Sequence, residues 1–96
     1  MRRIERTARF KRDYKREFRG SNKALLKTLL KEVLELLTDG QPLAERYRDH
    51  ALSGEWRDHR DCNIKPDLIL IYRIYRKSSE NIIQLVRLGS HSELGL

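Results

Sequence analysis

The chain has 96 residues, enough for one hydrophobic core and one domain over residues 1–96, but too few for a second domain or a solenoid. Lys and Arg number 21 against 14 Asp and Glu, so the net charge is +7 and nucleic acid or an acidic protein is the expected class of partner. The 39% of hydrophobic residues, arranged with clear periodicity, argue against a disordered chain.

The sequence lacks features that would direct it to a membrane or an oxidising compartment. No apolar run approaches the roughly 20 residues of a membrane span, and neither end has a signal-peptide pattern. Cys62 is the only cysteine, which rules out an intramolecular disulfide, and no Cys/His spacing matches a zinc site. We therefore expect a cytoplasmic protein without a membrane partner, a metal or another cofactor.

A short strand and a basic helix are predicted at the start of the chain. Residues 2–6 fit an edge strand, and Thr7 fits the N-cap of a helix over residues 8–19. Aromatic side chains recur on one face of this helix, at Phe10, Tyr14 and Phe18. The rest of its surface is basic, through Lys11, Arg12, Lys15, Arg16 and Arg19. These cations form either a solvated face or a surface that binds RNA or ribosomal phosphates.

A second helix follows Gly20, which ends the first. Ser21 or Asn22 can cap it, and leucines at helical spacing give it a broad apolar face. Gly40 and Pro42 end it. Because the link between the helices is brief, we expect them to lie side by side as an antiparallel hairpin.

The second half is rich in β-branched and aromatic residues and is predicted to form three strands, over approximately residues 56–64, 68–75 and 82–87. Polar turns separate them, which indicates an antiparallel meander. The predicted fold is therefore α+β: a two-helix hairpin packed on an antiparallel sheet of about four strands. Residues 41–55, between helix and sheet, form the longest irregular segment and are expected to carry function.

The strand over residues 68–75 is apolar on both faces, although two helices normally cover only one face of such a sheet. Either a protein partner or a second copy of the chain covers the other face, or the sheet curls over a second core of its own.

Candidates for chemistry lie at strand ends and in loops: His50, His59, Asp61, Asn63, Asp67, Arg87 and His91. Arg87 and His91 flank Gly89 at the end of the last strand. In an antiparallel meander the start of one strand and the end of the next meet at one edge, so Asp67 and Arg87 can be neighbours. No nucleophilic serine or cysteine arrangement and no metal-ligand spacing accompany them.

These side chains suit metal-free cleavage of RNA, in which a base activates the 2′-hydroxyl and an acid protonates the departing 5′-oxygen. Histidine can serve as either, and arginine can hold the phosphate. Simpler interpretations also exist. The histidines can be solvated, Arg87 can pair with Glu93 or Asp67, and Trp56 and the aromatic stripe of the first helix can belong to the core.

Three segments of the second half resemble the YafQ branch of the RelE/ParE toxin superfamily: Tyr47 to Trp56, Arg60 to Tyr72 and Val86 to Leu94. The basic helical hairpin before them also fits. The resemblance implies the fold predicted above and a toxin of a type II toxin–antitoxin pair. Such a toxin is a ribosome-dependent endoribonuclease that cuts messenger RNA in the ribosomal A site and is neutralised by a cognate antitoxin. Whether the toxin–antitoxin complex binds operator DNA stays open.

By position, the resemblance places the catalytic set on His50, Asp67, Arg87 and His91. His91 is then the acid for the leaving group and Arg87 stabilises the phosphate. His50 and Asp67 share the base and orienting roles.

The chain departs from the family pattern in two places. Asn63 stands where the family commonly has a histidine, so its role is limited to positioning the substrate, and His59 on the same strand face is a partial substitute. The chain ends Leu94-Gly95-Leu96 where the family has an aromatic residue that can stack on a base. Both departures predict a weakened nuclease.

Two other functions stay open. One is a binding-only relative that acts on the ribosome or the antitoxin, which the two departures favour. The other is a ParE-like inhibitor of DNA gyrase, and the retained catalytic set argues against it.

Overall fold

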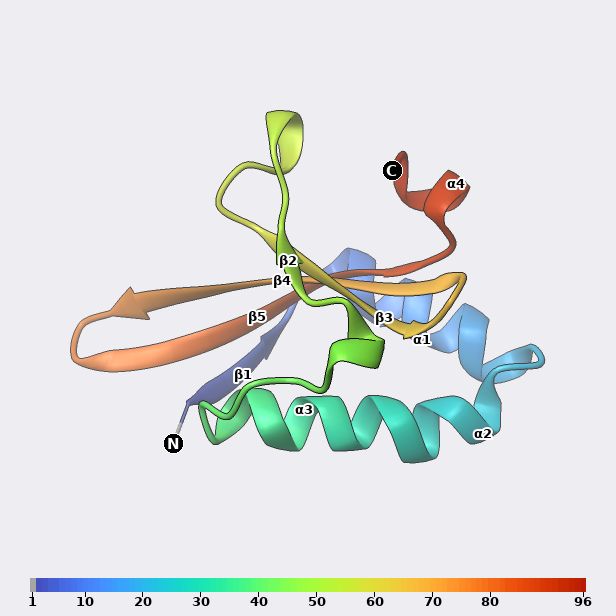
Figure 1. Cartoon of the computed structure of the whole chain (residues 1–96), viewed down its shortest axis with the longest axis horizontal. Helices are drawn as coiled ribbons and strands as arrows, with labels where there is room; N and C mark the ends of the chain where they lie inside the picture. Colours follow the sequence, from blue (N-terminus) through green and yellow to red (C-terminus); the bar gives the residue numbers. More distant parts are fainter. Residues whose placement is uncertain (1) are drawn as a thin grey trace.

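The computed structural model describes residues 2–96, which form a five-stranded mixed sheet with helices on both faces (Figure 1). The strands are β1 (Arg3–Arg6), β2 (His50–Ala51), β3 (Arg60–Lys65), β4 (Leu68–Lys77) and β5 (Glu80–Gly89), in the spatial order β1-β5-β4-β3-β2. The meander of β3, β4 and β5 is antiparallel, as predicted. The α+β class is confirmed.

The sheet differs from the prediction in number and direction of strands. It has five strands rather than about four, and β1 pairs with β5 in parallel. The four residues of β1 contain no pattern that distinguishes a parallel from an antiparallel strand. The direction of β1 is therefore set by its pairing with Ile82 to Leu85 of β5. The additional strand β2 has only two residues, and it forms because residues 50 and 51 lie against β3. Local propensity cannot specify so short a strand.

Helix α1 (Ala8–Arg19) begins and ends as predicted. The Thr7 hydroxyl accepts a hydrogen bond from the Phe10 backbone at 3.0 Å and donates one to the Val86 carbonyl at 2.8 Å. The cap therefore also ties the start of the helix to β5. Phe10 is buried, and the rings of Tyr14 and Phe18 pack beside it on the core, so the aromatic stripe is structural.

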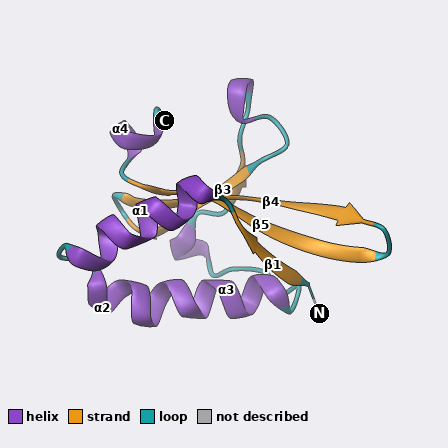
Figure 2. Ribbon diagram, turned by 180° about the vertical axis from the view of Figure 1, so that it is seen from behind, coloured by secondary structure: helices purple, strands orange, loops and turns teal. Residues whose placement is uncertain are grey.

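The second helix runs from Lys23 to Thr38 in three consecutive parts, α2 (Lys23–Leu25), a π-helical turn (Leu26–Leu30) and α3 (Lys31–Thr38). Asn22 is its N-cap residue, and Gly40 follows it at a φ of 71°, a conformation that favours glycine. Its inward side chains are buried: Leu26, Leu30, Val33 and Leu37. Figure 2 shows this helix and α1 on one side of the sheet.

The opposite face of the sheet carries a second core. Ile69 and Ile71 of β4 are fully buried there and pack with Leu94 of the C-terminal helix α4 (His91–Leu94). Leu52 and Trp56, from the irregular segment before β3, complete the cover. The predicted second core is therefore present, but α4 and the segment before β3 cover it rather than a curl of the sheet. Within residues 2–96, no helix is long and apolar enough to cross a membrane.

The bounds of the strands, and one additional helix, differ from the sequence prediction. The strand predicted over 56–64 begins at Arg60, because Gly54–Trp56 form a 3₁₀ turn and Asp58 has a φ of 69°. The β4–β5 hairpin is longer than predicted, with only residues 78 and 79 in its turn. Helix α4 was not predicted, because a single turn is held by its capping box and tertiary contacts rather than by periodicity.

Candidate active site

A pocket of about 680 Å³ lies on the face of the sheet that carries the second core. Its walls come from α1, the segment before β3, the strands β3 and β5, and the C-terminal turn. The lining residues are Arg9, His50, Leu52, Ser53, Glu55, Trp56, Asp61, Arg87, His91, Leu94, Gly95 and Leu96. The pocket thus combines two imidazoles, two guanidinium groups and a buried carboxyl.

His91 is held at the start of α4 by a capping box between Ser90 and Glu93. The Ser90 hydroxyl accepts from the Glu93 backbone at 3.2 Å, and Glu93 Oε1 accepts from the Ser90 backbone at 2.8 Å. The His91 backbone N–H donates to Asp67 Oδ1 at 3.0 Å, and His91 Nδ1 lies 3.0 Å from the same oxygen. With Nδ1 as the donor, Nε2 remains for a substrate.

Asp67 lies in the turn between β3 and β4, outside the pocket lining but in contact with His91. Hydrogen bonds from the backbone and side chain of His91 lower the pKa of its carboxyl. Asp67 is therefore an anion at neutral pH, placed to orient the imidazole and to stabilise its protonated form.

Arg87 on β5 is held by Asp13 of α1, not by Asp67 or Glu93. Its Nε donates to Asp13 Oδ2 at 2.7 Å and its Nη2 donates to Asp13 Oδ1 at 3.3 Å. The meander does bring the start of β4, next to Asp67, to the same edge of the sheet as the end of β5, which carries Arg87. The Asp67 carboxylate, however, is hydrogen-bonded to His91. Among residues 2–96, no protein group accepts a hydrogen bond from Arg87 Nη1, which leaves that nitrogen for a phosphate oxygen.

Asp13 is nearly fully buried, with 4% of its surface exposed. It also accepts from the Leu88 backbone at 3.0 Å and from Arg16 Nη1 at 3.1 Å. Burial alone would raise the pKa of Asp13, but the hydrogen bonds from Arg87 and Leu88 and the two guanidinium charges outweigh burial and lower it. The charged carboxylate is thus fully engaged in holding Arg87.

Arg16 closes the junction between α1 and the end of β5. Its Nη2 donates to the Leu88 carbonyl at 2.9 Å, and its Nε lies 3.4 Å from Glu93 Oε2. Gly89 passes beneath this pair so closely that a Cβ there would lie 3.0 Å from Arg16 Nη2 and 3.1 Å from Glu93 Oε1. A Cβ at position 89 would therefore press on the ends of these two side chains, which would have to shift by a few tenths of an ångström.

His50 and Asp61 are register partners on β2 and β3. His50 Nδ1 lies 2.6 Å from the carbonyl oxygen of Arg48 and 3.1 Å from Asp61 Oδ1. We assign the hydrogen bond to the shorter contact. Because a carbonyl only accepts, Nδ1 carries the proton and Nε2 is the basic nitrogen.

Asp61 is the buried carboxyl of the pocket, with 4% of its surface exposed. Burial raises its pKa, and the charges of His50 and His91 offset this only in part. Its Oδ1 has no hydrogen-bond partner among the described residues. A carboxyl with a raised pKa between two imidazoles in a pocket is typical of a catalytic site.

Comparison with known proteins identifies the family of the chain. Residues 2–95 match the family model described as "Bacterial toxin of type II toxin-antitoxin system, YafQ". The chain belongs to this family. An mRNA interferase toxin YafQ of Escherichia coli strain B is 32% identical over 95 residues, which cover 95% of this chain and 92% of that protein. A YafQ toxin of Haemophilus influenzae is 41% identical over 64 residues, 67% of this chain, and the match spans only 63% of that protein.

Solved structures of YafQ toxins and similar proteins have the same fold. A metal-bound toxin from Helicobacter pylori is 45% identical, with a TM-score of 0.81 over 98% of this chain and 99% of that one. The toxin in the E. coli DinJ–YafQ toxin–antitoxin complex is 32% identical, with a TM-score of 0.77 over 97% and 96% of the two chains. Residues 2–96 of the present chain contain no group of three or more His, Cys, Asp or Glu side chains arranged for a metal ion.

The two departures from the YafQ pattern lie near the pocket. Asn63 is half-buried on β3, on the same face as Asp61, but it does not line the pocket. His59 lies in the turn before β3 rather than on the strand, with its ring 5.3 Å from that of Trp56. Leu96 lines the pocket at the C-terminus, and Trp56 is its one aromatic lining residue within the described chain. The indole therefore belongs both to the second core and to the pocket.

The cations predicted on α1 do not form one surface. Lys11 and Lys15 line a separate groove between the helices, whereas Arg16 is held at the site by acidic side chains. Arg12 and Arg19 are exposed.

Sequence reasoning missed Asp13 and Arg9, and it weighed Asp61 without including it in the catalytic set. A signal for the first two is present, because Arg9, Asp13 and Arg16 share one helix face at i, i+4 and i+7. The same spacing is typical of ion pairs within a helix, such as that between Asp13 and Arg16, so it does not identify Arg87 as a partner. Cys62 is fully buried in the core, where burial raises the pKa of its thiol and makes it unreactive.

Proposed function

We propose that this chain is the toxin of a type II toxin–antitoxin pair and a ribosome-dependent endoribonuclease that cuts messenger RNA in the A site. The observation that supports this most strongly is the pocket itself, which combines His50, Asp61, Arg87 and His91 in a member of the YafQ family. Two imidazoles supply a base and an acid, and the guanidinium supplies the charge that a phosphoryl transition state needs.

The proposed reaction uses the 2′-hydroxyl of the substrate as nucleophile. Nε2 of His50 removes its proton, and the resulting oxyanion attacks the adjacent phosphorus. Arg87 holds the non-bridging oxygens through N–H groups that Asp13 does not use. Protonated Nε2 of His91 gives its proton to the departing 5′-oxygen. The products are a 2′,3′-cyclic phosphate and a 5′-hydroxyl, and no metal ion takes part.

The contacts of His50 and Asp67, the two residues that sequence alone could not rank, support different roles for them. Asp67 accepts both hydrogen bonds from His91, so we assign it to orienting the acid. His50 then serves as the base, and the buried carboxyl of Asp61 lies 3.1 Å from its Nδ1. Asn63 cannot exchange a proton near pH 7, and we keep it as a group that positions substrate.

The partners follow from this activity. We propose a cognate antitoxin, the ribosome and messenger RNA, and a cytoplasmic location in which all three meet. Of the cations predicted on α1, the exposed Lys11, Arg12, Lys15 and Arg19 would contact RNA phosphates from more than one side of the helix, whereas Arg16 is engaged by acidic side chains. The toxin–antitoxin complex, rather than the toxin alone, is the form that would bind operator DNA.

The test is a translation reaction with purified ribosomes, a defined message and the toxin. Primer extension should show cut ends within A-site codons for the wild type and none for His91→Ala, which should fold normally because His91 is exposed. Cut ends from His91→Ala at the wild-type rate would contradict the assignment. Inhibition without cut ends would indicate a binding-only relative, and a supercoiling defect would indicate a gyrase inhibitor.

A further inference from the structure

Arg9 of α1 lines the active-site pocket together with Arg87 of β5. It is an exposed residue in the first turn of the helix. The proposed reaction gives roles to His50, Arg87 and His91, but it gives none to Arg9. A second guanidinium group is therefore present at the pocket wall without an assigned role.

Helix α1 reaches the pocket because it runs along an open edge of β5. The strand β1 pairs with β5 only over residues 82–85, so β5 has no neighbouring strand on that side from Val86 onward. The helix takes the place of that strand. The Thr7 hydroxyl donates to the Val86 carbonyl at 2.8 Å, and the Asp13 carboxylate accepts from the β5 backbone at 3.0 Å. Arg9 lies between these two attachment points, and its side chain can pass the sheet edge to the pocket.

Arg9 shares a helix face with Asp13 and Arg16, but it has no acidic partner of its own. The Asp13 carboxylate accepts from Arg87 at 2.7 Å and from Arg16 at 3.1 Å, and Glu93 lies 3.4 Å from Arg16. Within residues 2–96, the Arg9 guanidinium forms no ion pair. The acidic groups at this junction are thus engaged by the other two arginines.

The acidic residues that line the pocket do not neutralise Arg9 either. Asp61 lies 3.1 Å from His50, and Glu55 is exposed and forms no ion pair among the described residues. The charge of Arg9 is therefore available to an anionic ligand in the pocket.

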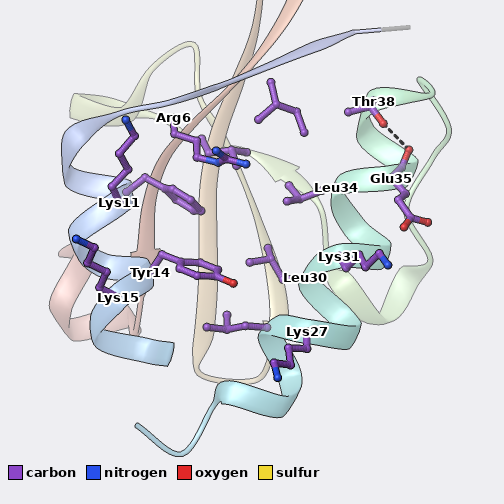
Figure 3. A pocket seen from close by; sticks show the side chains of 14 residues that line it. Arg6, Lys11, Tyr14, Lys15, Lys27, Leu30, Lys31, Leu34, Glu35 and Thr38 are labelled. Atoms are coloured by element: carbon purple, nitrogen blue, oxygen red, sulfur yellow. Dashed lines mark hydrogen bonds between the residues drawn. The ribbon is translucent and has the colours of Figure 1, made fainter. Parts of the chain in front are cut away.

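The position of Arg9 separates it from the lysines of the same helix. Figure 3 shows Lys11 and Lys15 beside the groove between the helices, and that groove shares no lining residue with the active-site pocket. Arg12 lines neither hollow. All cations of α1 lie in the described part of the chain, and among them Arg9 is the one that lines the active-site pocket.

Arg9 and Arg87 differ in how firmly they are held. Asp13 binds two nitrogens of Arg87, whereas no acidic group in residues 2–96 fixes Arg9. A fixed guanidinium is suited to charge that develops in the transition state. An unfixed one adjusts to the bound substrate and holds a phosphate equally well before and during the reaction. Such uniform binding lowers KM and leaves the rate constant unchanged.

We propose that Arg9 binds a backbone phosphate of the RNA in the active-site pocket and contributes to affinity rather than to the rate constant. The inference rests on the proposed function for the identity of the ligand, and on the packing of α1 against β5 for the residue. The planar guanidinium can bind two phosphate oxygens at once. The scissile phosphate and its neighbours offer this same chemistry, and the experiments below distinguish between them.

The direct test measures binding of a short 2′-fluoro RNA, which lacks the attacking hydroxyl, by fluorescence anisotropy. Arg9→Gln is compared with the wild type and with Arg76→Gln, which removes the same charge from an exposed residue of β4 outside both hollows. We expect about 3- to 10-fold weaker binding for Arg9→Gln and little change for Arg76→Gln. The slope of log K against log salt should fall by about 0.7 for Arg9→Gln. Equal losses of affinity in the two variants would overturn the proposal.

Two further measurements identify the contact. Arg9→Lys keeps the charge but not the planar fork, so it should keep the wild-type salt slope and have an affinity between those of the wild type and Arg9→Gln. RNAs with one neutral methylphosphonate at successive positions locate the phosphate, because Arg9→Gln should cost no further affinity once the contacted phosphate is neutral. The position at which the penalty vanishes distinguishes the scissile phosphate from a neighbour. A penalty that persists at every position would overturn the proposal.

Kinetics and stability distinguish binding from a structural role. With a ribosome-bound message, Arg9→Gln should raise KM about 3- to 10-fold while kcat stays within about twofold of the wild type. Its urea midpoint should not change, because Arg9 is exposed and forms no ion pair in the described chain. A lower kcat at unchanged KM, or a lower urea midpoint with wild-type RNA binding, would overturn the proposal.

The binding assay also separates failure of this inference from failure of the proposed function. If the wild type does not cleave the message, the proposed function fails, while anisotropy with the uncleavable RNA still reports on Arg9. If the wild type cleaves and Arg9→Gln has the wild-type KM and RNA affinity, the inference alone fails.

Discussion

Arg87 donates its Nε to Oδ2 of Asp13 at 2.7 Å, although 74 residues separate the two in the chain. The Arg87 side chain is 17% exposed and that of Asp13 is 5% exposed, so the contact is shielded from water. Because Asp13 holds both Nε and Nη2, the plane of the guanidinium is fixed. Its remaining N–H groups can then meet a phosphate without reorganisation, which is the condition for strong electrostatic catalysis.

Asp13→Asn tests this support. Asparagine offers one acceptor oxygen and turns an amino group towards the guanidinium groups, so we expect the free energy of unfolding to fall by about 2–3 kcal/mol. The rate constant of cleavage should fall more than KM rises, because substrate still enters the pocket but Arg87 is no longer fixed. Urea denaturation and single-turnover cleavage measure the two effects. Asp39→Asn, on an exposed residue after α3, is the matched control. An Asp13→Asn toxin with the wild-type rate constant would contradict the positioning role.

Asp61→Asn should stabilise the protein at neutral pH while reducing cleavage. Burial raises the pKa of Asp61 in the folded state, so the folded protein holds this proton more tightly than the unfolded chain does. Its contribution to stability is therefore complete below the unfolded pKa of about 3.9 and is lost as pH rises through the folded value. Asparagine has no proton to lose in this pH range, so Asp61→Asn removes this loss of stability.

The measurement for Asp61 is a series of urea denaturation curves from acid to neutral pH. The stability difference between Asp61→Asn and the wild type should be smallest below about pH 4 and should grow in favour of the variant as pH rises. Cleavage should decrease, since the variant no longer has a carboxyl beside His50 whose charge favours the protonated imidazole. A variant less stable than the wild type at neutral pH would show that the carboxylate is held by favourable contacts instead.

How well the sequence predicts each part of this site depends on how far apart in the chain the interacting residues lie. The caps at Thr7 and Gly40 are local chemistry, and the strands are local composition, so both were predictable. The partner of Arg87 was not, because no local pattern links it to a helix 74 residues away. Family resemblance indicated His50, Arg87 and His91, which line the pocket, and Asp67, which contacts His91 from outside it, whereas Asp13 behind Arg87 became visible only in three dimensions.

Helix α4 depends on both a local sequence signal and contacts with distant residues. The capping box of Ser90 and Glu93 is present in the sequence, but a four-residue helix has too few hydrogen bonds to form without tertiary contacts. Asp67 and Arg16 provide those contacts through His91 and Glu93. A local signal was present, and its structural meaning depended on distant residues.

Asp67→Asn should separate orientation from proton transfer at His91. The amide oxygen can still accept a hydrogen bond, but it carries no charge to stabilise the imidazolium. We expect cleavage to slow by about 10- to 100-fold and the alkaline limb of the pH–rate profile to move to lower pH. A purely structural role would lower the rate without moving the profile. Asp58→Asn, on an exposed turn residue, should leave both unchanged.

Asn63→His should increase cleavage. The substitution places a third imidazole on β3, on the face that carries Asp61, where other YafQ-type toxins are expected to have one. A general acid or base contributes about 10²–10⁴-fold when well placed, and a gain of about tenfold is expected for a group just outside the pocket. Single-turnover cleavage of a ribosome-bound message measures it, with Asn63→Gln as the control that cannot exchange a proton. Equal rates for the two variants would show that this position does not limit the reaction.

Trp56 can replace the C-terminal aromatic residue as the surface on which a base stacks. Its indole lines the pocket and packs on Ile69 and Ile71, so it is both held in place and accessible. Trp56→Leu keeps an apolar side chain but removes the ring, and should weaken RNA binding by about 1–3 kcal/mol. Trp56→Phe keeps a ring and should lose less. KM for a message and the urea midpoint, measured for both variants, separate stacking from packing. If both variants have the wild-type KM and only the urea midpoint falls, Trp56 belongs to the core alone and does not stack on a base.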